Sequence, residues 1–113
     1  MDPAQMRATV EKYIEAVSTD NLDLIREIYA DNATVEDPVG SAPHEGMTAI
    51  EAFYKKVHGL GVKLELTGPV RCAGNAAAFP FKANTGSHAL DIIDVFEFNE
   101  DGKVVSMKAY WGQ

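Results

Sequence analysis

Two carboxyl groups fall at positions where the pattern of this sequence points a side chain inward. Counting in steps of two along an alternating segment puts Asp94 on the same side as Ile92 and Phe96. By the same parity, Asp37 shares a face with Val35. Carboxyl groups in apolar surroundings have shifted pKa values and are suited to general acid–base chemistry. Asp37 and Asp94 are therefore candidates for proton transfer.

Phenol groups accompany these carboxyls, because Tyr13, Tyr29 and Tyr54 each fall on the apolar stripe of a predicted helix. A tyrosine in that position is usually core packing, and an aspartate before proline, as Asp37 is, usually serves a turn. An inward aspartate on a strand is harder to explain in this way, since burying an unpaired carboxylate is costly. The sequence pattern places no cation beside Asp94. Structural and chemical interpretations both stay open at this point.

Other kinds of chemistry find less support in the sequence. The three histidines, His44, His58 and His88, lack metal-ligand spacing and are predicted on a loop, a helix end and a strand start. No glycine-rich segment has the context of a phosphate-binding loop, and no serine or cysteine lies in a nucleophile motif. We therefore predict acid–base chemistry by carboxyl groups and phenols, with no metal site.

Helices come first among the elements that must position these groups. Apolar residues at steps of three and four predict a helix over residues 3–18. Asp20 and Asn21 offer a cap for a short second helix, whose inward stripe runs to Tyr29. The pattern from Thr48 to Glu51 matches a capping box and predicts the start of a third helix.

Strands fill most of the remaining chain. Predicted strands cover residues 33–37, 62–66, 76–84, 87–98 and 103–111, with a hairpin turn at 99–102. Helices followed by consecutive antiparallel strands indicate the α+β class. We predict a curved, mostly antiparallel sheet wrapped around three N-terminal helices, as a single domain over residues 1–113. This cone-shaped fold would leave a pocket between the concave face of the sheet and the helices.

Composition excludes several classes of partner. Ten basic and seventeen acidic residues give a net charge of −7, with no basic run that could bind nucleic acid or an anionic membrane surface. No segment is apolar and long enough to span a bilayer, and no signal peptide is recognised. Cys72 is the only cysteine, so an internal disulfide is excluded. We expect a cytoplasmic protein.

A resemblance to a known family extends these inferences. Residues 29–40 read YADNATVEDPVG and closely resemble the base-bearing segment of bacterial steroid Δ5-isomerases, the ketosteroid isomerases. Further similar stretches are residues 52–54, 66–71, 89–95 and 107–111. These matches follow one another in order over nearly the whole chain, which is more specific than any single motif.

The resemblance implies roles for individual residues. It implies a general base at Asp37 and two oxyanion donors at Tyr13 and Asp94, since in ketosteroid isomerases a tyrosine and a protonated aspartic acid hold the oxyanion. Five aromatic residues are expected to contact the substrate: Tyr29, Tyr54, Phe81, Phe96 and Trp111. It also implies a cis Asp37–Pro38 peptide bond.

The implied reaction moves a double bond of an apolar ketone, a steroid, into conjugation with its carbonyl. The family implies no cofactor and a homodimer, for which the apolar residues Ile93 and Val95 on the convex face of the sheet are suited. The hairpin between Phe81 and Asp91 is shorter than in well-known members, and little chain follows Trp111. Two alternatives remain: an apolar-ligand binding module without catalysis, and a related polyketide cyclase or epoxide hydrolase, the latter needing an arginine between its carboxyls.

Overall fold

Three helices form around the apolar stripes of the sequence. A computed structural model describes residues 1–112 and gives these helices as α1 (Pro3–Ser18), α2 (Leu22–Ile28) and α3 (Met47–Gly59). Asp2 caps α1, because its carboxylate accepts a hydrogen bond from the Gln5 N–H at 2.9 Å and the Gln5 side chain accepts one from the Asp2 N–H. The helix predicted over residues 3–18 is confirmed.

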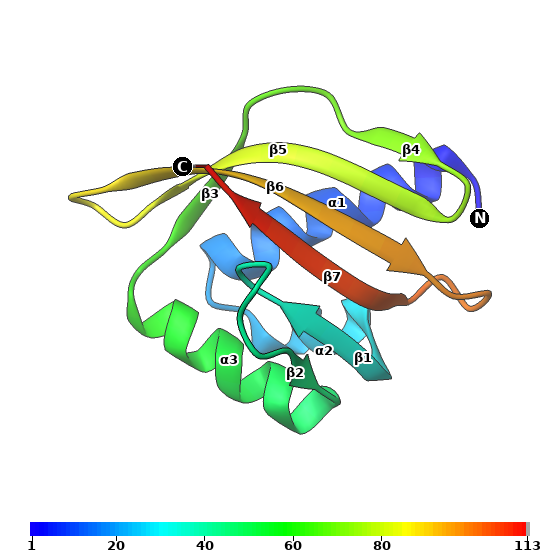
Figure 1. The fold of residues 1–113 in the computed structure, drawn as a ribbon, viewed down its shortest axis with the longest axis horizontal. Helices are drawn as coiled ribbons and strands as arrows, with labels where there is room; N and C mark the ends of the chain where they lie inside the picture. Colours follow the sequence, from blue (N-terminus) through cyan, green and yellow to red (C-terminus); the bar gives the residue numbers. More distant parts are fainter. Residues whose placement is uncertain (113) are drawn as a thin grey trace.

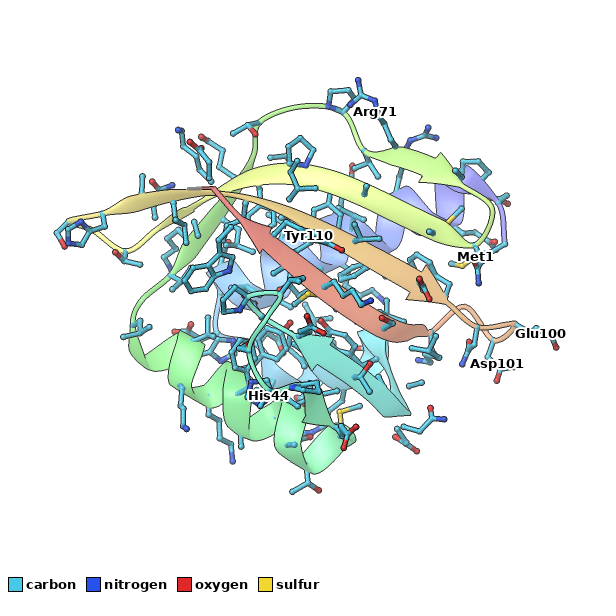
Figure 2. All side chains as sticks on the ribbon, viewed as in Figure 1. Met1, His44, Arg71, Glu100, Asp101 and Tyr110 are labelled. Carbon is cyan, nitrogen blue, oxygen red and sulfur yellow. The ribbon has the colours of Figure 1, made fainter. Side chains whose placement is uncertain are left out.

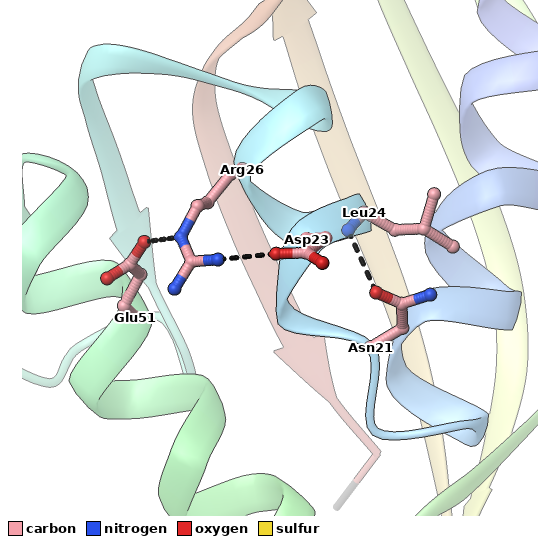
Figure 3. Close-up of polar contacts among 5 residues, drawn as sticks. All are labelled: Asn21, Asp23, Leu24, Arg26 and Glu51. Carbon is pink, nitrogen blue, oxygen red and sulfur yellow. Dashed lines mark hydrogen bonds and ion pairs between the residues drawn. The ribbon is translucent and has the colours of Figure 1, made fainter.

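Polar contacts hold α2 in place, as Figure 3 shows. The Asn21 side chain accepts a hydrogen bond from the Leu24 N–H at 3.2 Å and caps the helix. Arg26 donates to Asp23 of the same helix at 2.6 Å and also to Glu51 of α3. These contacts join α2 to α3 and engage the Arg26 guanidinium away from the interior.

Tyr29 starts a strand instead of extending the second helix, so its predicted place on a helix stripe is wrong. Helix α2 ends at Ile28, and the extended backbone of Tyr29 begins β1 (Tyr29–Glu36). This strand is therefore longer at its start than the predicted segment 33–37. Tyr29 pairs with Val104 of β7 (Val104–Trp111), a partner too distant in sequence for a local pattern to reveal.

The predicted capping box at the start of α3 is also wrong. The helix begins at Met47, and Gly46 is its N-cap, with no side-chain hydrogen bond to the first turn. Thr48 therefore lies inside the first turn, where its hydroxyl cannot act as an N-cap. The Gly46 N–H donates to the Ala33 carbonyl at 2.8 Å, and its backbone turns sharply (φ +84°) from a strand directly into the helix.

Seven strands form one sheet. Besides β1 and β7 they are β2 (His44–Glu45), β3 (Lys63–Leu66), β4 (Arg71–Ala73), β5 (Ala76–Asn84) and β6 (Ala89–Phe98). Their order is β2-β1-β7-β6-β5-β3, with β4 also paired to β5. All pairs are antiparallel except β1 with β7, which is parallel. The predicted mostly antiparallel sheet is confirmed.

The helices lie on one side of this curved sheet. In Figure 1, α1 runs behind β5, β6 and β7, while α3 lies beside β1 and β2. The parity predicted for β6 is confirmed, because Ile92, Asp94, Phe96 and Phe98 are all buried between sheet and helices. The predicted α+β class and cone shape are therefore confirmed. Within residues 1–112, every helix is too short or too polar to cross a membrane.

Candidate active site

A cavity of about 590 Å³ lies between the concave face of the sheet and the helices. Most of its lining residues are apolar, and the polar ones include Tyr13, Asp37, Lys56 and His88. The residues that line it are Tyr13, Val17, Asp37, Phe53, Tyr54, Lys56, Val57, Leu60, Val62, Leu64, Phe81, Ala83, Thr85, His88, Ala89, Leu90, Ile92 and Trp111. Volume and lining suit a small, largely apolar ligand.

Asp37 reaches the cavity from the bend that follows β1. Its peptide bond to Pro38 is cis, as predicted. The next residue, Val39, donates its N–H to the Ala109 carbonyl of β7 at 2.8 Å and so fixes the bend against the sheet. Trp111 then donates its indole N–H to the Asp37 carboxylate at 2.7 Å. The carboxylate is thereby oriented by the strand that also supports its backbone.

Burial raises the pKa of Asp37 above its ordinary value, because the charged form loses solvation. The hydrogen bond from Trp111 and the nearby His44 act in the opposite direction and lower this pKa. His44 pairs with Val35 across β1 and β2, and its ring stacks on Phe53, with centroids 4.5 Å apart. Burial therefore makes Asp37 a stronger base, and Trp111 and His44 partly offset this effect on its pKa.

Asp94 lies on the buried face of β6, next to the cavity wall. Ile92, on the cavity wall, is paired with Trp111, and Asp94 follows on the same face about 6.6 Å further along the strand. Its side chain is 1% exposed, and neither carboxyl oxygen has a hydrogen-bond partner among the residues that the structure describes. Burial raises the pKa of Asp94 well above its ordinary value, and the charge of Asp37 adds to this. Burial therefore favours the neutral form of this carboxyl group.

Three tyrosine hydroxyls form a chain beside Asp94. The Tyr54 oxygen lies 2.7 Å from that of Tyr29 and 3.0 Å from that of Tyr13. Burial is the main reason that the pKa of each phenol is well above its ordinary value. When Tyr29 donates to Tyr54 and Tyr54 to Tyr13, the Tyr13 proton remains available for a ligand in the cavity. The Asp94 charge would further raise the pKa of Tyr13.

The predicted site residues therefore separate into two groups. Those on the cavity wall are Tyr13, Asp37, Tyr54, Phe81 and Trp111. Those buried behind the wall are Tyr29, Asp94 and Phe96. The rings of Tyr29 and Phe96 pack edge to face at 6.3 Å, and Phe96 also packs against Tyr13 at 5.2 Å. This packing supports the wall, and direct contact of Tyr29, Asp94 and Phe96 with substrate stays a prediction.

Sequence reasoning missed the outer half of the cavity. Extending strand parity outward from Phe81 would have found Ala83 and Thr85, and from Ile92 it would have found Leu90 and His88. His44 was predicted on a loop, but it lies in strand β2 and faces the Asp37 side of the sheet. Its location depends on the short β1–β2 pairing, which has no clear sequence signal. Among residues 1–112, no group of three or more metal-binding side chains is clustered.

Comparisons with known proteins agree with this fold. The model of the SnoaL-like domain family matches residues 10–107. A steroid Δ-isomerase of Nocardioides simplex is 38% identical over 112 aligned residues, covering 96% of this chain and 90% of the relative. The epoxide hydrolase/cyclase-like enzyme SalBIII, which acts in pyran ring formation in the polyether salinomycin, is 28% identical with a TM-score of 0.89. That match covers 99% of this chain and 94% of the SalBIII chain. The chain therefore belongs to the SnoaL-like family of cone-shaped α+β domains, related to nuclear transport factor 2, with a steroid Δ-isomerase among its relatives.

Proposed function

We propose that this protein is a steroid Δ5-isomerase, which moves a β,γ double bond into conjugation with a 3-keto group. The observation that carries the proposal is the buried, unpartnered carboxyl of Asp94 near Tyr13, with Tyr13 and the Asp37 carboxylate on the wall of the same cavity. The 38% sequence identity to a steroid Δ-isomerase over most of the chain supports the same reaction.

Asp37 is the proposed proton carrier. Its carboxylate removes a proton from the carbon between the carbonyl and the double bond, and the released electron pair delocalises into a dienolate. The resulting carboxylic acid returns the same proton to the far carbon of the former double bond, so no other reactant is consumed. A buried base of raised pKa is suited to both steps, because it accepts the proton readily and still returns it.

Tyr13 and Asp94 are the proposed donors to the dienolate oxygen. Burial raises the pKa values of both groups and so favours their protonated, donating forms. Donors that are already fixed in an apolar site stabilise developing negative charge more than water does, since they need no reorientation. The Tyr29 and Tyr54 hydroxyls extend this network and hold the Tyr13 oxygen in place.

A cyclase or epoxide hydrolase is the second candidate, favoured by the structural similarity to SalBIII. An epoxide hydrolase of this family needs an arginine between its two carboxyl groups. No arginine lines the cavity in the described part of the chain, and Arg26 is engaged by Asp23 and Glu51 on the surface. A binding module without catalysis is the third candidate. It does not account for the unpartnered buried carboxyl of Asp94, which costs stability.

We also propose a homodimer and a cytoplasmic location. Ile93 and Tyr110 pair across β6 and β7 on the convex face, where they are 49% and 47% exposed. Figure 2 shows Tyr110 on the outer face of the sheet, away from the helices. Two large apolar side chains side by side on a sheet face are suited to burial against a second copy.

Turnover of an unconjugated 3-ketosteroid tests the proposed reaction. The conjugated product absorbs in the ultraviolet, and the substrate does not. We expect the rate of absorbance increase to be proportional to protein concentration and to exceed the rate in buffer alone. Steroid binding can be measured separately by quenching of the fluorescence of Trp111, the single tryptophan. If the protein binds the steroid but gives no absorbance change, it is a binding module instead.

A further inference from the structure

The cavity lining includes polar residues from α3 and from the β5–β6 hairpin. Moving along β6 toward its start and into the β5–β6 hairpin, the lining runs from Ile92 through Leu90 to His88, a span of about 13 Å. On α3 it runs from Tyr54 to Leu60, about 9 Å. In Figure 1 the β5–β6 hairpin and the C-terminal end of α3 lie at the same end of the molecule. Both elements therefore lead from the proposed catalytic groups to one common rim.

This rim carries Lys56 from α3 and Thr85 and His88 from the hairpin. The Lys56 ammonium has no ion pair or hydrogen bond with any described residue, whereas Lys12 and Lys82 pair with carboxylates. Asp37 is the only carboxylate among the described residues that line the cavity, and the Trp111 indole N–H donates to it. The rim is therefore locally positive on a chain whose net charge is −7.

We propose that this rim binds the anionic end of the substrate, so that the natural ligand is a flat apolar ketone bearing a carboxylate at the end remote from the carbonyl. The inference rests on the proposed function and specifies its substrate class. The apolar middle of the cavity, from Phe81 and Ile92 to Ala83 and Leu90, holds the rings. The Lys56 ammonium attracts the carboxylate, and Thr85 and His88 offer hydrogen bonds beside it.

Binding at the rim is the same before and during proton transfer, because the reacting carbons lie at the other end of the cavity. Such uniform binding lowers KM and leaves kcat nearly unchanged. An ion pair at a solvent-exposed rim should favour the carboxylate by about two- to fivefold. Salt should weaken this preference, because exposed charges are screened.

The test compares two ketosteroids that differ only in a free carboxylate or its methyl ester on the ring remote from the ketone. Dissociation constants of the conjugated forms are read from Trp111 fluorescence, and KM and kcat from the unconjugated forms. Lys56→Glu reverses the rim charge, and Lys55→Glu makes the same change at a neighbouring residue that does not line the cavity. We expect the ratio of ester to acid dissociation constants to fall by fivefold or more in Lys56→Glu and to change little in Lys55→Glu.

Equal ratios in the wild type and both variants would overturn the proposed rim. So would a preference for the acid that persists unchanged in 0.5 M salt. Because the fluorescence measurement needs no turnover, it separates the two proposals. Acid-selective binding without an absorbance change would refute the isomerase proposal and support the rim proposal. Turnover without acid-selective binding would support the isomerase proposal and refute the rim proposal.

Discussion

The pKa of Asp37 depends on three neighbouring influences that can be altered singly. Burial raises this pKa, and the Trp111 hydrogen bond is the larger of two opposing effects. Trp111→Phe removes the N–H donor and keeps an aromatic ring, so the pKa of Asp37 should rise. The base must be ionised to act, so the acidic limb of kcat/KM against pH should move to higher pH.

The matched control for this change is Tyr110→Phe, on the same strand but on the opposite face of the sheet. Its profile should coincide with that of the wild type. If Trp111→Phe leaves the acidic limb where it was, the indole does not stabilise the ionised base.

Asp94 should leave a signature in stability as well as in catalysis. Its pKa is raised in the folded state, so its favourable contribution is full below the unfolded pKa of about 3.9 and is lost as pH rises toward the folded pKa. Relative to Asp94→Asn, the wild type should lose up to about 1.4 kcal/mol of unfolding free energy per pH unit over that interval. Urea unfolding of both proteins between pH 4 and pH 8 measures the difference.

A difference that stays constant with pH would mean that Asp94 ionises in the folded protein as it does in the unfolded chain. The same variant reports on catalysis, because an amide also donates a hydrogen bond. Asp94→Asn should therefore keep much of the turnover, and Asp94→Ala, which removes the donor, should lose more.

At the scale of elements, regular patterns were predictable and junctions were not. Alternation along β6 predicted that Asp94 is buried with Ile92 and Phe96, and helical spacing predicted α1 with its bounds. The errors lie where distant pairing decides the local structure. Tyr29 joins β1 because it pairs with Val104, and α3 starts directly after Gly46 because the Gly46 N–H is hydrogen-bonded to the Ala33 carbonyl. The parallel β1–β7 pairing that supports the Asp37 bend likewise leaves no signal in a local pattern.

Gly46 fixes the entry of α3 and hence the position of Tyr54. Its backbone (φ +84°, ψ 161°) lies in a region that side chains rarely adopt, while a Cβ there would be in ordinary contact, 3.7 Å from the Asp31 carbonyl oxygen. Gly46→Ala should therefore lower the unfolding free energy through backbone strain, by about 1–3 kcal/mol. Denaturant unfolding measures this change.

Gly59 provides the comparison, because it ends the same helix in helical conformation with open space around it. Gly59→Ala should be neutral or stabilising by up to about 1 kcal/mol. Equal effects of the two substitutions would contradict a special backbone requirement at Gly46.

At the scale of the whole molecule, the proposed dimer forms through the convex face of the sheet. Ile93→Glu places a charge in the centre of the proposed contact beside Tyr110 and should convert the dimer to a monomer at micromolar concentration. Ala73→Glu adds the same carboxylate to an exposed position of β4 and should leave the dimer intact. Light scattering gives the mass of each protein. A wild type that is already monomeric would remove the proposed interface.

The central claim is that Asp37 carries the proton of a steroid isomerisation. The most direct measurement is the turnover of an unconjugated 3-ketosteroid by the wild type and by Asp37→Asn, followed as the ultraviolet absorbance of the enone. The account predicts that kcat falls by about 100-fold to 10,000-fold, which is the range for the loss of a general base. The affinity for a phenol that mimics the dienolate should be largely kept. Near-normal turnover by Asp37→Asn would contradict it.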